Sequence, residues 1–390
     1  MAAPHPRPAA IFGSLAIRNL RGYAALDIEF GPGPQLIWGP NAAGKTTLLE
    51  AVVLLAVGRS HRTTADAELI RWGTDFLRLE GSMARTGEPE SGGSAGATLE
   101  LTLQSGGRKK IQVNGVPRRP AALAEHLRTV LFAPEEMLLV VGPPSLRRTE
   151  LDGLTAPHDP SYGSNMATYG RALQQRNSLL RSIREGEADR DELRLWDDPF
   201  LTAGAAVVAA RLRLLELLAE PLATAHREIA PDEGRLAVAY SSNAAPLGGE
   251  RPREALARRL GETAEKEVWN GSTLIGPHRD DLVFSLDGRD LATFSSRGQQ
   301  RTAILALKLA ELDLLTALDG RPPLLLLDDV FSELDPARRG HLVRRLAELP
   351  QALITTTDPA DIDADLRRRA RPWRVLTSAA GGSQVVEADS

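Results

Sequence analysis

A nine-residue loop constrains this chain more than any other feature, because it stands between a short apolar run and an apolar helix. Its residues are Gly39, Pro40, Asn41, Ala42, Ala43, Gly44, Lys45, Thr46 and Thr47. The spacing G-x-x-x-x-G-K-[ST] is that of the phosphate-binding loop, in which backbone N–H groups and a helix N-terminus surround a polyphosphate. Lys45 adds a positive charge, and Thr46 is placed to put its hydroxyl on Mg²⁺. We interpret the loop as a nucleotide site; the alternative is a glycine-rich turn with a solvated lysine.

Length and composition limit the number of domains and the class of protein that this chain can form. With 390 residues, of which 42% are hydrophobic, the chain is long enough for two domains or for one large domain with an insertion. Apolar runs are too short for a membrane span, and residues 1–10 lack the apolar core of a secretory signal. Cysteine is absent, which excludes disulfides and thiolate zinc sites and fits a cytoplasmic protein. The net charge of −4 means that any nucleic-acid binding must use a local basic surface.

Strands are predicted on both sides of the loop. Residues 15–19 and 26–30 favour an antiparallel edge, and Asn114-Gly115 is typical of a tight hairpin turn. Further strands are predicted at residues 76–81, 98–103, 111–113 and 128–132, with a flexible loop over 85–96.

A mostly helical region follows, from about residue 141 to 270. Apolar spacing predicts one helix around residues 169–183 and a second that begins at Asp198-Pro199 and ends at Pro221. The first helix carries Arg171, Arg176, Arg181 and Arg184, which we interpret as a solvated face, with a nucleic-acid surface as the alternative. A strand at 236–240 and a helix at 254–268 complete the region, and no heptad pattern predicts a long coiled coil.

The last part of the chain contains a second motif, and this one is acidic. Asp287-Gly288 predicts a hairpin between strands at 282–286 and 289–293, and an apolar helix follows at 304–315. Four leucines then lead into Asp328 and Asp329, as expected of a buried parallel strand that carries carboxylates at its C-terminal end. Together with a phosphate loop, Asp328 would hold the metal through water and Asp329 would orient or deprotonate the attacking water. The alternative is that the aspartates cap the next helix.

Two short stretches resemble motifs of ATP-binding-cassette (ABC) ATPases. Ser295-Ser296-Arg297-Gly298-Gln299 resembles the signature motif, and Ser332-Glu333-Leu334-Asp335 resembles the D-loop that crosses the dimer interface. In that class, the signature of one subunit contacts the γ-phosphate bound by the other subunit. The resemblance therefore implies an ATP site in which Lys45, Asp329 and Ser296 act in catalysis and Gly298 and Gln299 contact the nucleotide across a homodimer.

Over nearly its whole length the chain resembles the RecF family, which is related to the heads of SMC and Rad50 proteins. The matching stretches are Asn19-Leu20-Arg21-Gly22-Tyr23, the phosphate loop, Gly58-Arg59-Ser60-His61-Arg62-Thr63, Pro134-Glu135 through Arg147-Arg148, Gln175-Arg176-Asn177, Gly276-Pro277-His278-Arg279-Asp280-Asp281, the signature, and the aspartate strand through Asp335.

This resemblance implies an α/β fold of the ABC-type ATPase head. The head would hold a mixed sheet around the phosphate loop and an antiparallel β subdomain, over residues 1–140 and 271–390. Residues 141–270 would form an inserted, mostly helical arm without a long coiled coil. The implied function is a weak, switch-like ATPase with Mg²⁺ that dimerises on ATP and binds DNA at gaps or single-strand–duplex junctions. It would act with RecR and RecO to load RecA in DNA repair, replication restart and the SOS response, and Arg21 would lie against the adenine.

Three departures from ABC ATPases in general suit a timing switch better than a pump. Asp329 stands where many members carry a longer glutamate, Thr355, Thr356 and Thr357 occupy the region of the switch histidine, and no Q-loop glutamine lies near Glu135. A transporter subunit would keep the histidine and lack the helical arm. An SMC-type protein would need long heptads, and an Old-family nuclease would carry an added nuclease domain beyond the tail at residues 379–390.

Several basic residues are candidate DNA contacts. Arg59, His61, Arg62 and Arg71 are the candidates near the phosphate loop, and the stretch 59–64 is equally consistent with a solvated connection. Arg367, Arg368 and Arg369 are equally well explained as a solvated helix end. Because phosphate contacts need only basic density, we expect binding without sequence preference that weakens steeply with salt.

Overall fold

The computed structural model describes residues 10–85, 96–377 and 382–388. Most of the predicted loop at 85–96 and parts of the tail at 379–390 lie outside these residues. Contacts divide the chain into two compact units. Unit 1 comprises Met1–Met137, Ala225–Asp232 and Arg301–Ser390, and unit 2 comprises Leu138–Thr224 and Glu233–Gln300. Residues 271–300 group with unit 2, where the strand at 281–286 pairs with the strand at 236–241.

Unit 1 contains an antiparallel sheet with the order β2-β1-β4-β5-β6-β7. Its strands are β1 (Ala10–Leu20), β2 (Tyr23–Glu29), β4 (Phe76–Arg85), β5 (Thr98–Gln104), β6 (Lys110–Val113) and β7 (Val116–Pro117). Asn114 and Gly115 have φ angles of 51° and 74°, as a type I′ turn requires, so the predicted hairpin is confirmed. Burial alternates along β5, which places one face of the sheet in the core.

The second sheet of unit 1 holds the nucleotide motifs. Its order is β15-β14-β3-β13-β12-β8, and every pairing except β14 with β15 is parallel. The strands are β3 (Gly33–Trp38), β8 (Thr129–Phe132), β12 (Leu324–Asp328), β13 (Gln351–Thr356), β14 (Arg371–Thr377) and β15 (Ser383–Glu387). All five residues of β12 are buried, as predicted for a central parallel strand. Strands β14 and β15 were not predicted from the sequence.

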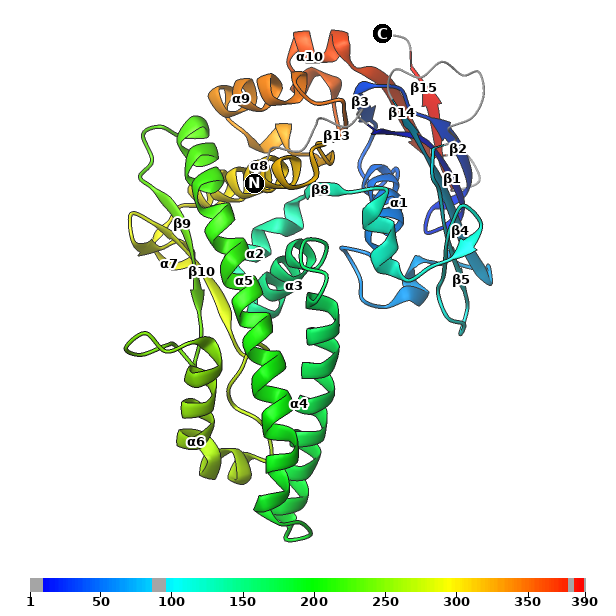
Figure 1. The fold of residues 1–390 in the computed structure, drawn as a ribbon. Coiled ribbons are helices and arrows are strands. Elements are labelled where there is room, and N and C mark those ends of the chain that lie inside the picture. The colour runs from blue at the N-terminus through cyan, green and yellow to red at the C-terminus, as the bar shows by residue number, and fades with distance from the viewer. Residues whose placement is uncertain (1–9, 86–95, 378–381, 389–390) are drawn as a thin grey trace. The chain divides into compact units, whose positions relative to one another are not determined.

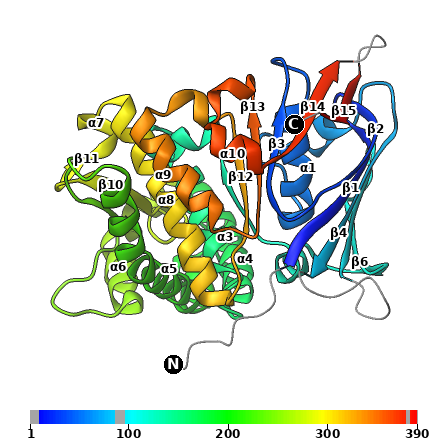
Figure 2. The ribbon, with the colours of Figure 1, turned by 90° about the horizontal axis from the view of Figure 1, so that it is seen from above.

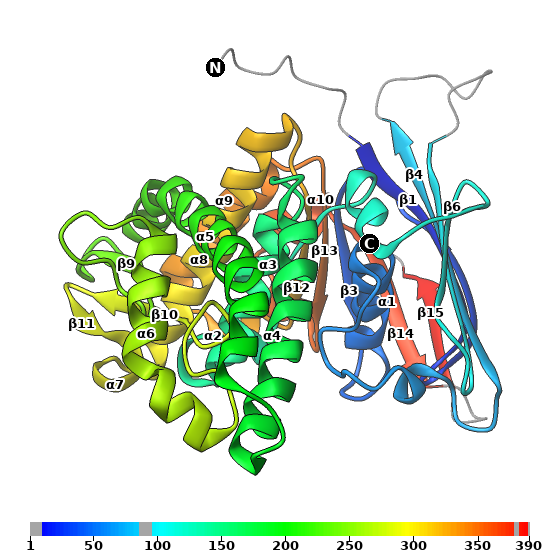
Figure 3. The same cartoon turned by 60° about the horizontal axis from the view of Figure 1, so that its bottom comes forward.

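Helix α1 (Lys45–Val57) packs between the two sheets of unit 1 (Figure 2). It is apolar on all sides and contacts β1, β4 and β5 of one sheet and β12 and β13 of the other (Figure 3). Unit 1 also contains most of α8 (Arg297–Asp319), with α9 (Pro336–Ala347) and α10 (Ala364–Arg369). Short 3₁₀ helices lie at η1 (Asp66–Leu69), η2 (Pro120–Glu125), η3 (Pro134–Met137), η5 (Phe331–Glu333) and η6 (Pro359–Asp361).

Unit 2 is mostly helical, and its two longest helices run side by side (Figure 1). Its helices are α2 (Leu138–Val141), α3 (Pro144–Thr155), α4 (Tyr162–Glu185), η4 (Arg190–Leu193), most of α5 (Arg194–Ile229), α6 (Pro252–Asn270) and α7 (Leu291–Phe294). A small antiparallel sheet has the order β11-β10-β9, from Arg289–Asp290, Asp281–Leu286 and Leu236–Ser241. No helix among the described residues is long and apolar enough to cross a membrane.

Three predicted boundaries in the helical part of the chain are wrong. Helix α5 begins at Arg194 and continues to Ile229, so Pro199 and Pro221 both lie inside it. Phe200 and Leu222 are fully buried beside these prolines, and this packing outweighs the backbone hydrogen bond that each proline removes. The predicted strand at 289–293 is paired only at Arg289–Asp290 and then turns into α7.

Arg176 is part of the core of unit 2, which corrects the prediction that it lies on a solvated face. Its guanidinium donates to Asp197 at 2.6 Å, to Thr273 Oγ1 at 2.9 Å and to Glu267 at 3.0 Å. Arg176 is 2% exposed and Glu267 is fully buried, where desolvation raises the pKa of the glutamate. The cation also lies over the ring of Phe200. This arginine therefore ties α4 to α5 and α6.

We expect Arg176→Met to lower the free energy of unfolding by about 3–5 kcal/mol, because it leaves the buried Glu267 without its cation. The matched control is Arg181→Met on the same helix, whose side chain is exposed. The control should change stability by less than about 0.5 kcal/mol. Urea denaturation followed by circular dichroism measures both. Equal stability of the two variants would contradict the structural role of Arg176.

The motif Gly276-Pro277-His278-Arg279-Asp280-Asp281 joins the elements of unit 2. The ring nitrogen Nδ1 of His278 lies 2.5 Å from the hydroxyl of Tyr169, and the buried Asp280 accepts hydrogen bonds from Tyr240 and Ser242. Asp281 forms a two-bond ion pair with Arg147. The sequence singled out this motif, and the structure shows that it connects α4 and β9 with the loop that precedes β10.

His278 should make unit 2 sensitive to acid. Burial, with Arg279 nearby, lowers the pKa of His278 to about 4, whereas an unfolded histidine titrates near pH 6.5. The unfolded state therefore binds more protons between these values, and stability should fall as the pH drops from about 6.5 to about 4, by up to about 3 kcal/mol. His278→Asn keeps an acceptor for Tyr169 but does not titrate. Urea midpoints across this pH range should fall more steeply in the wild type than in the variant; parallel profiles would refute the assignment.

Candidate functional site

The nucleotide motifs meet at one edge of the parallel sheet. Strand β13 pairs with β3 on one side and with β12 on the other, all parallel. The carboxyl ends of parallel strands lie at the same edge, so the loop after β3 and the aspartates at the end of β12 converge there. Thr46 and Asp328 are 282 positions apart in the sequence, and their side chains form a hydrogen bond of 2.7 Å.

The phosphate loop holds its lysine across the loop. The Nζ of Lys45 donates to the carbonyl oxygens of Gly39 at 2.8 Å and Pro40 at 3.1 Å. Burial lowers the pKa of Lys45, while the charges of Asp329 and Asp328 oppose that shift. Within the described residues, no side chain caps the N-terminus of α1. Its first backbone N–H groups therefore suit an anion such as a phosphate.

Two glycines of the loop cannot be replaced by larger residues. A Cβ atom at Gly39 would lie 2.2 Å from the carbonyl oxygen of Val375 on β14. A Cβ atom at Gly44 would lie 2.6 Å from Ser383 Oγ on β15 and 3.0 Å from the Tyr23 ring. The hydroxyl of Tyr23 also donates to the Gly44 carbonyl at 3.1 Å. Tyr23 and Ser383 thus support the loop from behind, a role that the sequence did not reveal.

Thr46, Asp328 and Thr355 form a chain of polar contacts. Asp328 is 5% exposed and accepts from Thr46 Oγ1 at 2.7 Å and from Thr355 Oγ1 at 2.5 Å. Thr355 therefore orients the carboxylate. The sequence marked this threonine only as a replacement for a histidine, and it gave no sign of the contact.

These residues fit a Mg²⁺ ion that is bound together with a nucleotide. The described residues contain no cluster of three or more metal-binding side chains. Mg²⁺ in nucleotide sites usually takes one or two protein ligands and completes its shell with phosphate oxygens and water. The hydroxyl of Thr46 would supply one such ligand, and the carboxylate of Asp328, which accepts the hydrogen bond of Thr46, would hold the metal through a water.

Asp329 has a strained backbone and an unused carboxylate oxygen. Its φ angle is 53°, which is uncommon for a residue with a side chain, and its backbone N–H is held by the carbonyl and hydroxyl oxygens of Thr355. Oδ1 of Asp329 is buried and has no hydrogen-bond partner in the described part of the chain. Burial raises the pKa of Asp329, with Lys45 opposing and Asp328 adding to the shift. Such strain and unmet hydrogen bonding are typical of functional positions.

Arg21 is held by an ion pair. Its guanidinium donates to both carboxylate oxygens of Glu50, at 2.6 and 2.9 Å, and Ser60 donates to the same carboxylate at 2.5 Å. Glu50 is fully buried; burial alone would raise its pKa, but the hydrogen bonds of Arg21 and Ser60 outweigh that effect and lower it. The structure gives Arg21 a clear role in linking β1 and β2 to α1. The contact with adenine stays a prediction.

The four candidate DNA residues near the loop differ in exposure. Arg59 is exposed, and Arg62 lies 3.4 Å from Glu50. Arg71 donates to the Gly22 carbonyl at 2.6 Å. Both ring nitrogens of His61 are buried without a hydrogen-bond partner among the described residues, and burial lowers its pKa. Of these four, Arg59 alone is therefore both exposed and free, within the described chain, to contact a phosphate.

The signature residues lie in unit 2, at the start of α8. Ser296 accepts from the backbone N–H of Gln299 at 3.2 Å, and the Gln299 side chain accepts from the Ser296 N–H at 2.9 Å. This reciprocal pair is a capping box, which fixes the helix start. Ser296, Arg297 and Gly298 lie at this solvent-facing helix start, where Arg297 and Gly298 are exposed. The D-loop lies in unit 1, where Ser332 donates to the Asp329 carbonyl at 2.9 Å.

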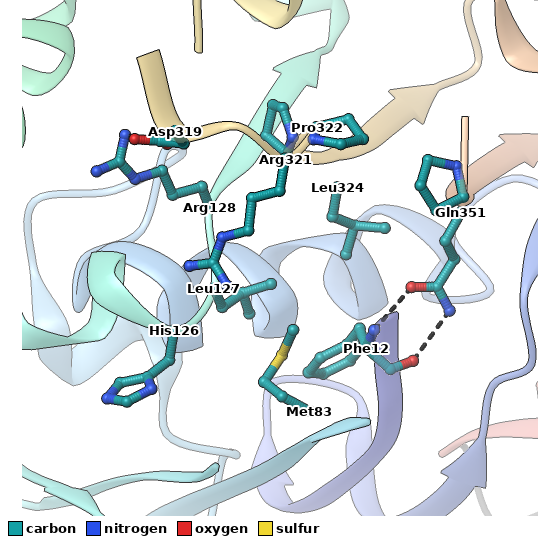
Figure 4. A pocket seen from close by; sticks show the side chains of 12 residues that line it. Phe12, Met83, His126, Leu127, Arg128, Asp319, Arg321, Pro322, Leu324 and Gln351 are labelled. Carbon is teal, nitrogen blue, oxygen red and sulfur yellow. Dashed lines mark hydrogen bonds and ion pairs between the residues drawn. The ribbon is translucent and has the colours of Figure 1, made fainter. Parts of the chain in front are cut away.

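A pocket elsewhere in unit 1 is too small for a nucleotide. Figure 4 shows it between Arg128, Asp319, Met83 and the pair Phe12 and Gln351. Gln351 binds the backbone of Phe12 through hydrogen bonds of 2.8 and 2.9 Å. The cavity volume of about 20 Å³ accommodates a single water.

Comparison with known proteins decides the family. Residues 11–365 match the family model described as the RecF/RecN/SMC N terminal domain. The DNA replication and repair protein RecF of Heliobacterium modesticaldum is 38% identical over 93% of this chain and 96% of its own length. The chain belongs to the RecF family. A second RecF protein, from Chloroflexus aurantiacus, is 39% identical over 93% of this chain and 97% of its own length.

Solved structures support the same assignment. The recombination mediator protein RecF-ATP in the RecFOR pathway has a TM-score of 0.86 and 31% identity, over 98% of this chain and 99% of its own. The Smc head domain of Pyrococcus furiosus has a TM-score of 0.55 at 14% identity, over 97% and 96% of the two chains, and shares the fold alone. The predicted fold class is thus confirmed. This RecF-family chain has an ABC-type ATPase head with a mostly helical part, and the described residues contain no long coiled coil.

Proposed function

We propose that this RecF-family chain is an ATP-dependent, DNA-binding recombination mediator. The observation that carries the proposal is the hydrogen bond of 2.7 Å between Thr46 and Asp328. It lies beside the phosphate loop and the N-terminus of α1, which no described side chain caps. The likeness to RecF-ATP supports ATP as the nucleotide, and the names of the relatives support DNA replication and repair as the process.

Each residue at the sheet edge has a task in hydrolysis. The Lys45 ammonium and the N–H groups of α1 hold the phosphates, and Thr46 and Asp328 hold Mg²⁺. When bound there, Mg²⁺ would supply positive charge that offsets the charge on the phosphate oxygens. Oδ1 of Asp329, buried and without a partner in the described chain, orients the attacking water or takes its proton. Because Asp329 has a shorter side chain than glutamate, we propose slow hydrolysis, suited to a switch.

The ATP site of one chain is completed by a second copy. Ser296, Gly298 and Gln299 open a helix start that faces solvent, which suits a γ-phosphate bound by a partner subunit. ATP would close the dimer and hydrolysis would release it.

The dimer would act on DNA rather than on a small substrate. We propose binding at gaps or single-strand–duplex junctions, with RecR and RecO as partners in loading RecA. The division into an ATPase head over 1–140 and 271–390 and a helical arm over 141–270 belongs to the same proposal.

Fluorescence anisotropy with labelled gapped DNA tests this function directly. The wild type should bind more tightly with ATP than with ADP, without preference among unrelated sequences. The logarithm of the binding constant should fall linearly with the logarithm of salt concentration. Equal affinity with ATP, ADP and no nucleotide, or a sequence preference that survives high salt, would reject the proposal.

A further inference from the structure

Unit 1 carries a group of exposed cations that, apart from Arg59, belong to none of the motifs described above. We name it the basic hairpin surface, and its members are Arg59, Arg108, Lys110, Arg118 and Arg119. All five are exposed, and none of their side chains forms a hydrogen bond or ion pair within the described part of the chain. From Leu101 to Ala124 the sequence contains no aspartate or glutamate, although the whole chain has a net charge of −4. The cluster is thus a local departure from the overall charge.

Lys109 brings the two separate segments of this surface together. Its Nζ donates to the Gly58 carbonyl at 2.8 Å and pairs with Asp66 at 2.7 Å. A Cβ atom at Gly58 would lie 3.1 Å from both Ile111 and Pro120. Arg59 follows Gly58 directly, so it lies beside the segment that carries the other four cations.

The alternation of the hairpin turns its cations to solvent. Ile111 and Val113 of β6 are buried in the core between the sheets, so Lys110, next to Ile111, points to the opposite face. The N–H of Arg118 donates to the Ile111 carbonyl at 3.0 Å, which keeps Arg118 and Arg119 beside β6. The cations are therefore held by ordered backbone rather than by a loose loop.

An exposed tryptophan lies at the same end of the sheet. Trp72 is 99% exposed in a turn closed by the hydrogen bond from Thr74 N–H to the Arg71 carbonyl. The Ser105 N–H donates to the Asp75 carbonyl at 2.8 Å, so this turn lies beside the turn between β5 and β6. Figure 3 shows β4, which follows the tryptophan turn, and β6 in this sheet. A fully exposed tryptophan near free cations is the combination that holds unpaired bases.

We propose that the basic hairpin surface binds the phosphates of a DNA strand and that Trp72 stacks on an unpaired base of that strand. This inference rests on the proposed function and assigns DNA binding to a particular face. The contacts of Lys109 and Ser105 bring two acidic residues, Asp66 and Asp75, next to the basic hairpin surface. The charge of Asp66 is already balanced by its ion pair with Lys109. Charge complementarity therefore favours a polyanion, and the tryptophan favours one with exposed bases.

Two variants of the full-length protein, measured with ATP by fluorescence anisotropy, separate the phosphate-binding role from the stacking role. Changing Arg108, Lys110, Arg118 and Arg119 together to Gln should weaken binding of duplex and gapped DNA at least roughly tenfold. The salt slope should shrink by about 0.9 for each duplex phosphate that the variant no longer neutralises. Trp72→Ala should leave duplex affinity unchanged and weaken binding of gapped and single-stranded DNA roughly 5- to 100-fold. Circular dichroism and urea midpoints verify folding.

A charge-matched control removes the effect of overall charge. Exchange of Arg171, Arg181, Lys266 and Arg289 of unit 2 for Gln makes the same change in net charge on exposed side chains. Equal weakening of DNA binding in this control would overturn the inference, as would full DNA binding by the first variant, which would indicate a protein partner on this surface. If the wild type itself binds no DNA, the proposed function fails together with this inference. If the wild type binds DNA and the variants bind it with the same affinity, this inference alone fails.

Discussion

We expect Lys45→Met to weaken ATP binding by roughly 10²- to 10⁴-fold and, with it, the ATP-dependent association of two chains. The ammonium spans the phosphate loop through two carbonyl oxygens, at 2.8 and 3.1 Å, and is only 7% exposed. A charged hydrogen bond contributes about 1.5–3 kcal/mol, so the loss of two such bonds that Lys45 would make to phosphate oxygens corresponds to roughly 10²- to 10⁴-fold in affinity. Equilibrium titration with a fluorescent ATP analogue measures the loss.

The matched control is Lys266→Met, which removes an exposed lysine of unit 2. It should bind the analogue as the wild type does. Methionine is close to lysine in size and removes a charge that burial disfavours, so the protein should stay folded. A Lys45→Met protein that is folded and binds the analogue within a few-fold of wild type would refute the assignment of the phosphate loop.

We expect Asp329→Asn to lower the rate of ATP hydrolysis by roughly 10²- to 10⁴-fold, the usual contribution of a general base, while ATP stays bound. The φ angle of 53° makes asparagine the suitable replacement, because Asn tolerates the left-handed region better than most residues. The variant removes the carboxylate but keeps the backbone hydrogen bond to Thr355. Phosphate release measured at saturating ATP gives the rate, and the dimer should outlast that of the wild type.

Asp328→Asn distinguishes the two neighbouring aspartates. Asp328 accepts from Thr46 and Thr355, so its change should weaken Mg²⁺-dependent ATP binding rather than hydrolysis of bound ATP alone. If Asp329→Asn hydrolysed ATP at the wild-type rate, or failed to bind ATP as Asp328→Asn does, the division of roles would be wrong.

Local patterns were sufficient to predict the motif-bearing elements. The strand, loop and helix around Lys45 follow from a contiguous motif, and β12 follows from four leucines before two aspartates. Strands β14 and β15 were not predicted. Strand β14 pairs with β3, which lies over three hundred positions earlier, and β15 pairs only with β14. In α5, tertiary packing outweighs the local signal of Pro199 and Pro221, so the helix boundaries could not be read from the sequence.

The site shows the same limit at the level of side chains. The proximity of Thr46 and Asp328 was expected from parallel strand ends, and the structure places them in contact. The support given by Tyr23, Thr355 and Ser383 comes from strands that only the fold brings together, and no motif marks it. Similarly, an arginine such as Arg176 is expected at the surface, and its structural role becomes visible only through its buried partner Glu267. The spacing of residues in the sequence identifies the motif that carries the chemistry, whereas the residues that position this motif can be identified only from the fold.

The central claim is that one chain carries half of an ATP site and a second chain completes it. Sedimentation velocity with and without ATP tests it most directly, on the wild type, Ser296→Arg, and a mixture of Lys45→Met with Ser296→Arg. ATP should convert the wild type to a dimer and leave each variant monomeric. The mixture should form some dimer, because one composite site then retains both Lys45 and Ser296. A wild type that stays monomeric with ATP, or a Ser296→Arg variant that dimerises as the wild type does, would contradict the claim.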